Sequence, residues 1–177
     1  MVTFALMQNK VEILNSEAKD IDVIFEFYDM AIAHQKKVFN KHWQGFSRDL
    51  VTEEIADGRQ YKILIDGVPA AIFAVTFNDE LIWKQRDHDS IYIHRIVTHP
   101  DFRGYSFVKR IIVWAKNYAA AHQLKFIRMD TWADNEKLLE YYTGCGFDFA
   151  GTVTLTETKG LPKHYEGISL NLFEIKL

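Results

Sequence analysis

The stretch SIYIHRIVTHPDFRGYSF, residues 90–107, decides the fold of this chain. Its first eight residues, Ser90 to Val97, are mostly β-branched or aromatic, as is typical of a strand. Pro100 ends that strand, because proline lacks the N–H group that strand pairing needs. From there on apolar residues recur at the three- and four-residue spacing of a buried helix face, at Phe107, Ile111, Trp114, Ala115, Tyr118 and Ala119. A strand, a tight turn and a helix therefore follow one another.

The turn between that strand and that helix has the features of an anion-binding site. Gly104 lets the backbone approach a ligand closely, and Arg103 beside it carries a positive charge. The unpaired N–H groups at the start of the helix and the positive end of its dipole both point into the turn. An isolated Arg-Gly pair is more typical of a surface turn, so it is the flanking strand and helix that favour a pyrophosphate here.

The rest of the chain reads as alternating helices and strands around this segment. Apolar spacing predicts helices from Asp20 to about Lys37, from Ser47 to about Gly58, and from Asp134 or Asn135 to Tyr142. Strands are expected near Val11–Leu14, on both sides of the Asp66–Gly67 turn, at Phe126–Thr131, at Gly151–Glu157 and at Ile168–Ile175. The segments 39–46, 78–89 and 158–167 are expected to be connections.

This order of elements predicts an α/β domain that spans residues 1–177. A strand-helix-strand crossover pairs its two strands in parallel, whereas strands joined by a hairpin pair antiparallel. We therefore expect a mixed, mostly antiparallel sheet with a central parallel βαβ unit and helices on both faces.

Composition excludes several classes of protein. A net charge of −3 gives no bulk attraction to nucleic acid or to an anionic membrane. The single cysteine, Cys145, cannot form an internal disulfide, and no apolar run approaches the ~20 residues that span a bilayer. The N-terminus lacks the pattern of a signal peptide. These features predict a soluble cytoplasmic protein; a homodimer is compatible with them.

Three motifs together resemble the GNAT N-acetyltransferase superfamily, whose members transfer acyl groups from acyl-coenzyme A. They are the run HRIVTHPDFRGYS (residues 94–106), the pair Asp134-Asn135 that opens a helix, and YYTGCGF (residues 141–147) with a tyrosine before a Gly-Phe pair. The resemblance is close from Ser90 to Phe147. In one respect the sequence departs from the family, because Ser106 and Val108 stand where its loop carries further glycines.

The resemblance implies a binding mode for acetyl-CoA and a fold that provides it. The two parallel strands should separate at their carboxyl ends, and pantetheine should pair with the backbone of Ile96, Val97 and Thr98. The pyrophosphate should lie on the backbone amides of residues 103–108, which are Arg103, Gly104, Tyr105, Ser106, Phe107 and Val108. Asn135 matches the family residue that approaches the pantetheine arm, and Tyr142 the one near the sulfur.

Each candidate for chemistry also has a structural alternative. His94 has the ordinary pKa of a base near neutrality, yet a hydrogen-bonded histidine within the sheet explains it as well. Tyr142 either protonates the departing thiolate or packs in the core. Phe39 and Trp43, in the loop expected to line the acceptor pocket, either contact an apolar acceptor or close the core. Tyr92, two residues from His94, is expected on the same face of the strand.

The expected activity is transfer of an acetyl group from acetyl-CoA to a primary amine, of a small molecule or a peptide, in a ternary complex. No metal is expected, because no cysteine or acidic partner completes a zinc set and the other histidines show no metal-ligand spacing; they are His34, His42, His88, His99, His122 and His164. Cys145 is read as a small buried hydrophobe rather than a nucleophile. A non-catalytic acyl-CoA-binding or regulatory domain is the alternative, suggested by the two missing loop glycines.

Overall fold

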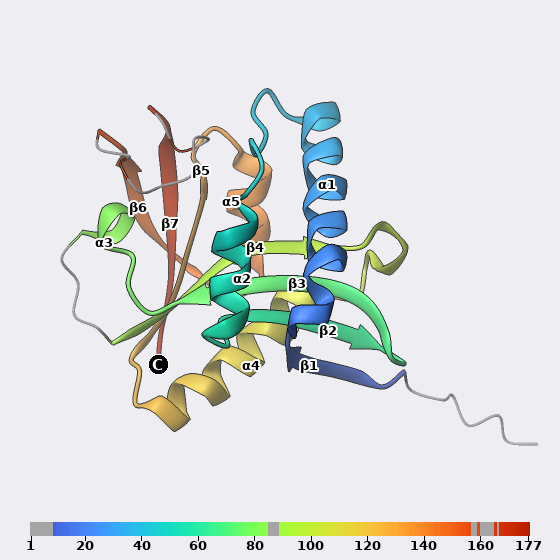
Figure 1. Ribbon diagram of the computed structural model, residues 1–177. Coiled ribbons are helices and arrows are strands. Elements are labelled where there is room, and N and C mark those ends of the chain that lie inside the picture. Colours follow the sequence, from blue (N-terminus) through green and yellow to red (C-terminus); the bar gives the residue numbers. More distant parts are fainter. Residues whose placement is uncertain (1–8, 85–88, 157–158, 160–164, 166) are drawn as a thin grey trace, which may run out of the picture.

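The computed structural model describes residues 9–84, 89–156, 159, 165 and 167–177 (Figure 1). Within them, seven strands form one sheet in the order β1-β2-β3-β4-β5-β7-β6. The strands are β1 (Val11–Asn15), β2 (Gln60–Ile65), β3 (Val68–Thr76), β4 (Ser90–Thr98), β5 (Phe126–Trp132), β6 (Asp148–Thr154) and β7 (Ser169–Lys176). Only β4 and β5 pair in parallel among these strands. The predicted mixed sheet with one parallel unit is confirmed.

Helices cover both faces of the sheet. They are α1 (Ile21–Val38), α2 (Arg48–Ala56), α3 (Glu80–Trp83), α4 (Phe107–His122) and α5 (Glu136–Gly144). The neighbouring β3 residues Ile72 and Phe73 point to opposite faces, and Ile72 packs with α1 and α2 whereas Phe73 packs with α4. Figure 1 shows α1 and α2 on one side of the sheet and α4 and α5 on the other.

Local sequence explains where the main helices begin. Ser47 accepts a hydrogen bond from the backbone N–H of Leu50 at 3.1 Å and so caps α2, as predicted. Asn135 caps α5 in the same way, through the N–H of Leu138. The short helix α3 was not expected; it lies in the segment predicted as a polar connection, where its Ile82 and Trp83 are buried in a cluster with Tyr92.

The parallel strands separate as the family resemblance implied. β4 and β5 pair only at Ser90–Phe126, Ile91–Ile127 and Tyr92–Arg128, although both strands continue well beyond these pairs. A gap therefore opens between their carboxyl ends.

None of the helices in the described part of the chain has the length and apolar character of a membrane span.

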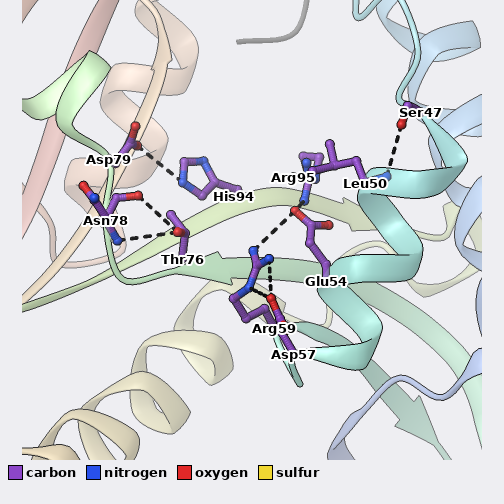
Figure 2. Close-up of polar contacts among 10 residues, drawn as sticks. All are labelled: Ser47, Leu50, Glu54, Asp57, Arg59, Thr76, Asn78, Asp79, His94 and Arg95. Atoms are coloured by element: carbon purple, nitrogen blue, oxygen red, sulfur yellow. Dashed lines mark hydrogen bonds and ion pairs between the residues drawn. The ribbon is translucent and has the colours of Figure 1, made fainter. Parts of the chain in front are cut away.

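A bulge in β4 changes the direction of Arg95. His94 pairs with Ala74 and Val97 with Ile72, so the two residues Arg95 and Ile96 lie opposite the single residue between Ala74 and Ile72. Arg95 has a φ of +50°. Regular alternation predicts that Arg95 points away from the face of His94, which is wrong: Figure 2 shows both side chains on the same side of the strand.

Candidate functional site

A cavity of about 430 Å³ occupies the gap between the separated strands. Its walls come from α1 and the segment after it, from the ends of β4 and β5, from α5, and from Tyr165. Segments far apart in the sequence therefore meet here because the parallel pairing stops early. The expected pantetheine-binding residues Ile96, Val97 and Thr98 all line this cavity, as does Arg103.

A second, more open cavity of about 1000 Å³ lies at the turn before α4. Arg103 borders both cavities, and Gly104, Tyr105 and Ser106 border the second. Lys109 and Arg110 in the first turn of α4 also line it, and the sequence reading missed them. The signal was available, since two consecutive cations beside a predicted phosphate turn favour an anion.

The turn itself has the backbone that close approach requires. Gly104 has a φ of +89°, and a Cβ atom there would meet no protein atom within 4 Å, so the space beside it is open. Ser106, at the N-cap of α4, has a φ of +54°, a left-handed conformation that glycine adopts more readily. Phe107 and Val108 are buried in the core, which turns the bulky Val108 side chain away from the turn.

Tyr142 both lines the cavity and packs against the core. Its ring centroid lies 5.5 Å from that of Phe173 and 6.3 Å from that of Phe147. Burial raises the pKa of Tyr142 above its ordinary value, with smaller contributions from Tyr141, Cys145 and Asp130. The phenol therefore keeps its proton at neutral pH, as a proton donor must. The two sequence interpretations of Tyr142 are compatible in this geometry.

His94 lines the cavity beside a carboxyl group that the sequence reading missed. Its Nε2 atom lies 3.4 Å from Oδ2 of Asp79, a residue just before α3 (Figure 2). Burial raises the pKa of Asp79 to about 7. Burial, and then the charge of Arg95, lowers the pKa of His94 to about 3. Both groups are thus displaced toward their neutral forms.

A second carboxyl group, Asp130 at the end of β5, completes this wall of the cavity. Burial, and then Asp79, raises its pKa well above the ordinary value. One ligand atom each from Asp79, His94 and Asp130 lie within 4.8 Å of one another, and this is the set with metal-ligand geometry in the described residues. An acid inside the apolar strand FIRMDTW was the signal that could have identified Asp130.

Arg95 also borders the cavity, and its charge is compensated. Its guanidinium forms an ion pair with Glu54 of α2, which in turn lies 3.9 Å from Nη1 of Arg59 (Figure 2). The guanidinium carbon of Arg95 lies 5.0 Å from the ring centroid of Phe46. This chain of charges anchors the bulge of β4 to α2.

The other predicted residues differ in whether they reach the cavity. Phe39 and Trp43 line it, and Trp43 also packs on Phe46 at 5.3 Å between ring centroids. Tyr92 is buried outside the cavity, and Arg128 donates to its hydroxyl at 3.4 Å, so the structure does not bring Tyr92 to the site. The side chain of Asn135 serves as the cap of α5.

Comparison with known proteins identifies the family that the chain matches. The model of the Acetyltransferase (GNAT) family matches residues 26–147, which is more than half of the chain. The N-acetyltransferase YesJ of Bacillus subtilis is 31% identical over 74 residues, which cover 41% of this chain and 41% of YesJ. The match therefore spans less than half of that relative.

Solved structures share the fold. A GNAT-family acetyltransferase of Listeria monocytogenes superposes with a TM-score of 0.74 at 22% identity, covering 99% of each chain. YncA of Salmonella typhimurium, solved with its cofactor acetyl-CoA, superposes with a TM-score of 0.64 at 14% identity, covering 94% of each chain. The resemblance read from residues 90–147 is confirmed.

Proposed function

Because the chain belongs to the acetyltransferase (GNAT) family, we propose that it transfers an acetyl group from acetyl-CoA directly to a primary amine. One observation carries this proposal: the separated ends of β4 and β5 enclose a cavity that holds His94 and Tyr142 together and opens toward the turn at Arg103. Salmonella YncA, which has the same fold, was solved with acetyl-CoA, and this supports the choice of donor.

The donor would extend from the second cavity into the first. Its pyrophosphate would lie on the backbone amides of residues 103–108, where the turn leaves open space at Gly104 and the helix presents its positive end. Lys109 and Arg110 would add charge complementarity. Pantetheine would pair with the unpaired edge of β4 at Ile96 to Thr98.

The chemistry then needs positioning and proton transfer. The bulge at Arg95 and Ile96 would leave a backbone N–H of β4 available near the cavity to stabilise the tetrahedral oxyanion. Tyr142 would give its proton to the thiolate as the C–S bond breaks, and His94 would take a proton from the amine. No covalent enzyme intermediate is required, because both substrates meet in one cavity.

The first test measures binding of acetyl-CoA, by calorimetry and by thermal unfolding. Acetyl-CoA should raise the melting temperature progressively with its concentration. Gly104→Asp places a carboxylate beside the expected pyrophosphate and should remove that shift, whereas Gly45→Asp, at another glycine with positive φ and open space, should keep it. No binding at millimolar acetyl-CoA would contradict the proposal.

The second test separates the enzyme from its rival, a non-catalytic acyl-CoA-binding domain. Purified protein with acetyl-CoA and a panel of amines should release coenzyme A in proportion to acetylated product. Binding without turnover on any amine of the panel would favour the rival instead.

A further inference from the structure

Asp79, His94 and Asp130 bring two carboxyl groups and an imidazole to one wall of the cavity. His94 and Asp130 line the cavity, and Asp79 lies behind His94 with its side chain only 8% exposed. Their ligand atoms lie within 4.8 Å of one another. Three acceptor groups at this separation suit a small cation that carries several hydrogen-bond donors.

Two oxygen atoms of this wall have no hydrogen-bond partner among the described residues. They are Oδ2 of Asp79 and Oδ1 of Asp130, and both are buried. An unsatisfied buried carboxylate oxygen costs free energy, and native structures usually supply a partner. The contact of Asp79 with His94 at 3.4 Å is at ion-pair distance but lacks hydrogen-bond geometry. The wall therefore has spare acceptors.

The neighbouring groups do not neutralise these carboxyl groups. Arg95, next to His94 on β4, is paired with Glu54. Tyr142 on α5 and Tyr165 before β7 both face the cluster, and burial raises the pKa of each phenol, which keeps it neutral. Because burial raises the pKa of both carboxyl groups, the positive charge that would favour their ionised forms must come from a ligand.

The position of Asp130 indicates which ligand group would meet it. Its charge contributes to the raised pKa of Tyr142, so the carboxyl group lies close to the proposed acid as well as to His94. In the proposed reaction the acceptor nitrogen must stand beside the thioester carbon, whose sulfur lies near Tyr142. The cluster therefore faces the place of the acceptor nitrogen.

We propose that Asp130 binds the ammonium group of an acceptor that arrives as a protonated aliphatic amine, and that His94 and Asp79 together take up its proton. This inference rests on the proposed function. Asp130 is the one carboxylate among the described lining residues, and Met30, Phe39, Trp43 and Leu138 contribute apolar lining. The acceptor is thus a monocationic primary amine with an apolar body.

The proposed proton path begins with neutral His94 in the tautomer that carries its ring hydrogen on Nε2. The ammonium gives one proton to Nδ1 of His94, and the Nε2 hydrogen passes to the carboxylate of Asp79 once the imidazole turns to bring their 3.4 Å contact into hydrogen-bond geometry. The neutral amine attacks the carbonyl carbon, so that the C–N bond forms and the C–S bond breaks. Tyr142 protonates the thiolate and regains the second proton released by the nitrogen. Asp79 then returns its proton to Nε2 of His94, and Nδ1 gives the proton taken from the amine to solvent, which restores the starting tautomer.

Binding of the amine alone tests Asp130. 2-Phenylethylamine is titrated by calorimetry into protein saturated with coenzyme A, which allows no reaction. Asp130→Asn should weaken amine binding by about 10- to 100-fold, the usual value of a hydrogen bond to a charged group, and leave coenzyme A affinity unchanged. Asp148→Asn, an exposed acid on β6, is the matched control. Equal amine affinity in wild type and Asp130→Asn would overturn the proposal.

Neutral and polycationic ligands test the chemical class. The wild type should bind 2-phenylethylamine more tightly than 2-phenylethanol, and Asp130→Asn should lose that preference. Spermidine should bind more weakly than 2-phenylethylamine; tighter binding would refute the apolar body. Zinc chloride tests for a metal site in the same place. If zinc binds the wild type and inhibits turnover, and Asp130→Asn no longer binds it, the cluster is a metal site and the amine assignment is overturned.

Turnover tests the proton path. Asp79→Asn should lower kcat more than it raises KM, and the defect should shrink at high pH, where more of the amine arrives unprotonated. A defect that is independent of pH would show that Asp79 has only a structural role. If acetyl-CoA fails to bind at all, the proposed function fails; if the enzyme turns over amines equally well without Asp130, only this inference fails.

Discussion

Replacing Asp79 by asparagine should change how stability depends on pH, because the carboxyl group is buried without adequate partners. Its side chain is 8% exposed, and burial raises its pKa from 3.8 to about 7. A group whose pKa is raised on folding binds its proton more tightly in the folded state. The carboxyl group therefore favours folding fully below its unfolded pKa, and that contribution is lost as pH rises through the folded pKa.

The expected magnitude follows from the size of the shift. A displacement of about three pKa units corresponds to about 4 kcal/mol at 1.36 kcal/mol per unit. The free energy of unfolding of Asp79→Asn, minus that of the wild type, should thus rise by up to about 4 kcal/mol between pH 4 and pH 8. His94 titrates in both proteins. Asp79 also raises the pKa of Asp130, so its removal lowers that pKa and changes the difference in the same direction.

Urea unfolding at each pH, followed by tryptophan fluorescence, measures this difference. His94→Gln gives a control of opposite sign, because the pKa of His94 is lowered on folding to about 3, and wild-type His94 favours folding more as pH rises toward 6.5. The reasoning is refuted if the difference in free energy of unfolding between Asp79→Asn and wild type changes by less than about 1 kcal/mol over this range. Such a result would mean that Asp79 has an ordinary carboxyl pKa.

Three further predictions concern other parts of the site. Tyr142→Phe keeps the ring that packs on Phe173 but removes the proton donor. The kcat should fall about 10²- to 10⁴-fold, with little change in melting temperature or acetyl-CoA affinity. A much lower melting temperature with intact kcat would make Tyr142 a core residue only. Ser106→Gly should raise the free energy of unfolding by about 1 kcal/mol, because Ser106 has a φ of +54°, and urea unfolding would contradict this if the variant were less stable. Glu54→Ala leaves Arg95 buried without its partner and should cost about 3–5 kcal/mol, measured in the same way; a loss below 1 kcal/mol would mean that Arg95 finds another partner or water.

The turn at Arg103 and Gly104 was predictable because its signals are local. A proline, an arginine and a glycine between a β-branched run and an amphipathic run restrict the backbone within a few residues. The structure accordingly begins α4 at Phe107 and gives Gly104 a positive φ. The parallel pairing of β4 with β5 followed from the crossover through α4 alone.

The wall of the cavity that holds Asp79, His94 and Asp130 was less predictable, because it depends on contacts between distant segments. Asp79 and Asp130 stand 51 positions apart in the printed sequence and share no motif. They come together only because β4 lies between β3 and β5 and because the pairing of β4 with β5 ends at Tyr92. No local pattern encodes that meeting.

By itself, the sequence determined the mixed α/β class, the parallel unit and the turn at Arg103, since periodicity and turn chemistry act over a few residues. Only the tertiary structure decided which side chains share a cavity and what charge they carry. The bulge in β4 brings Arg95 to the face of His94, and burial displaces the pKa values of Asp79 and His94. Both effects arise from packing against segments remote in the chain, where the loss of water, and not the local sequence, sets the free energy of a charge.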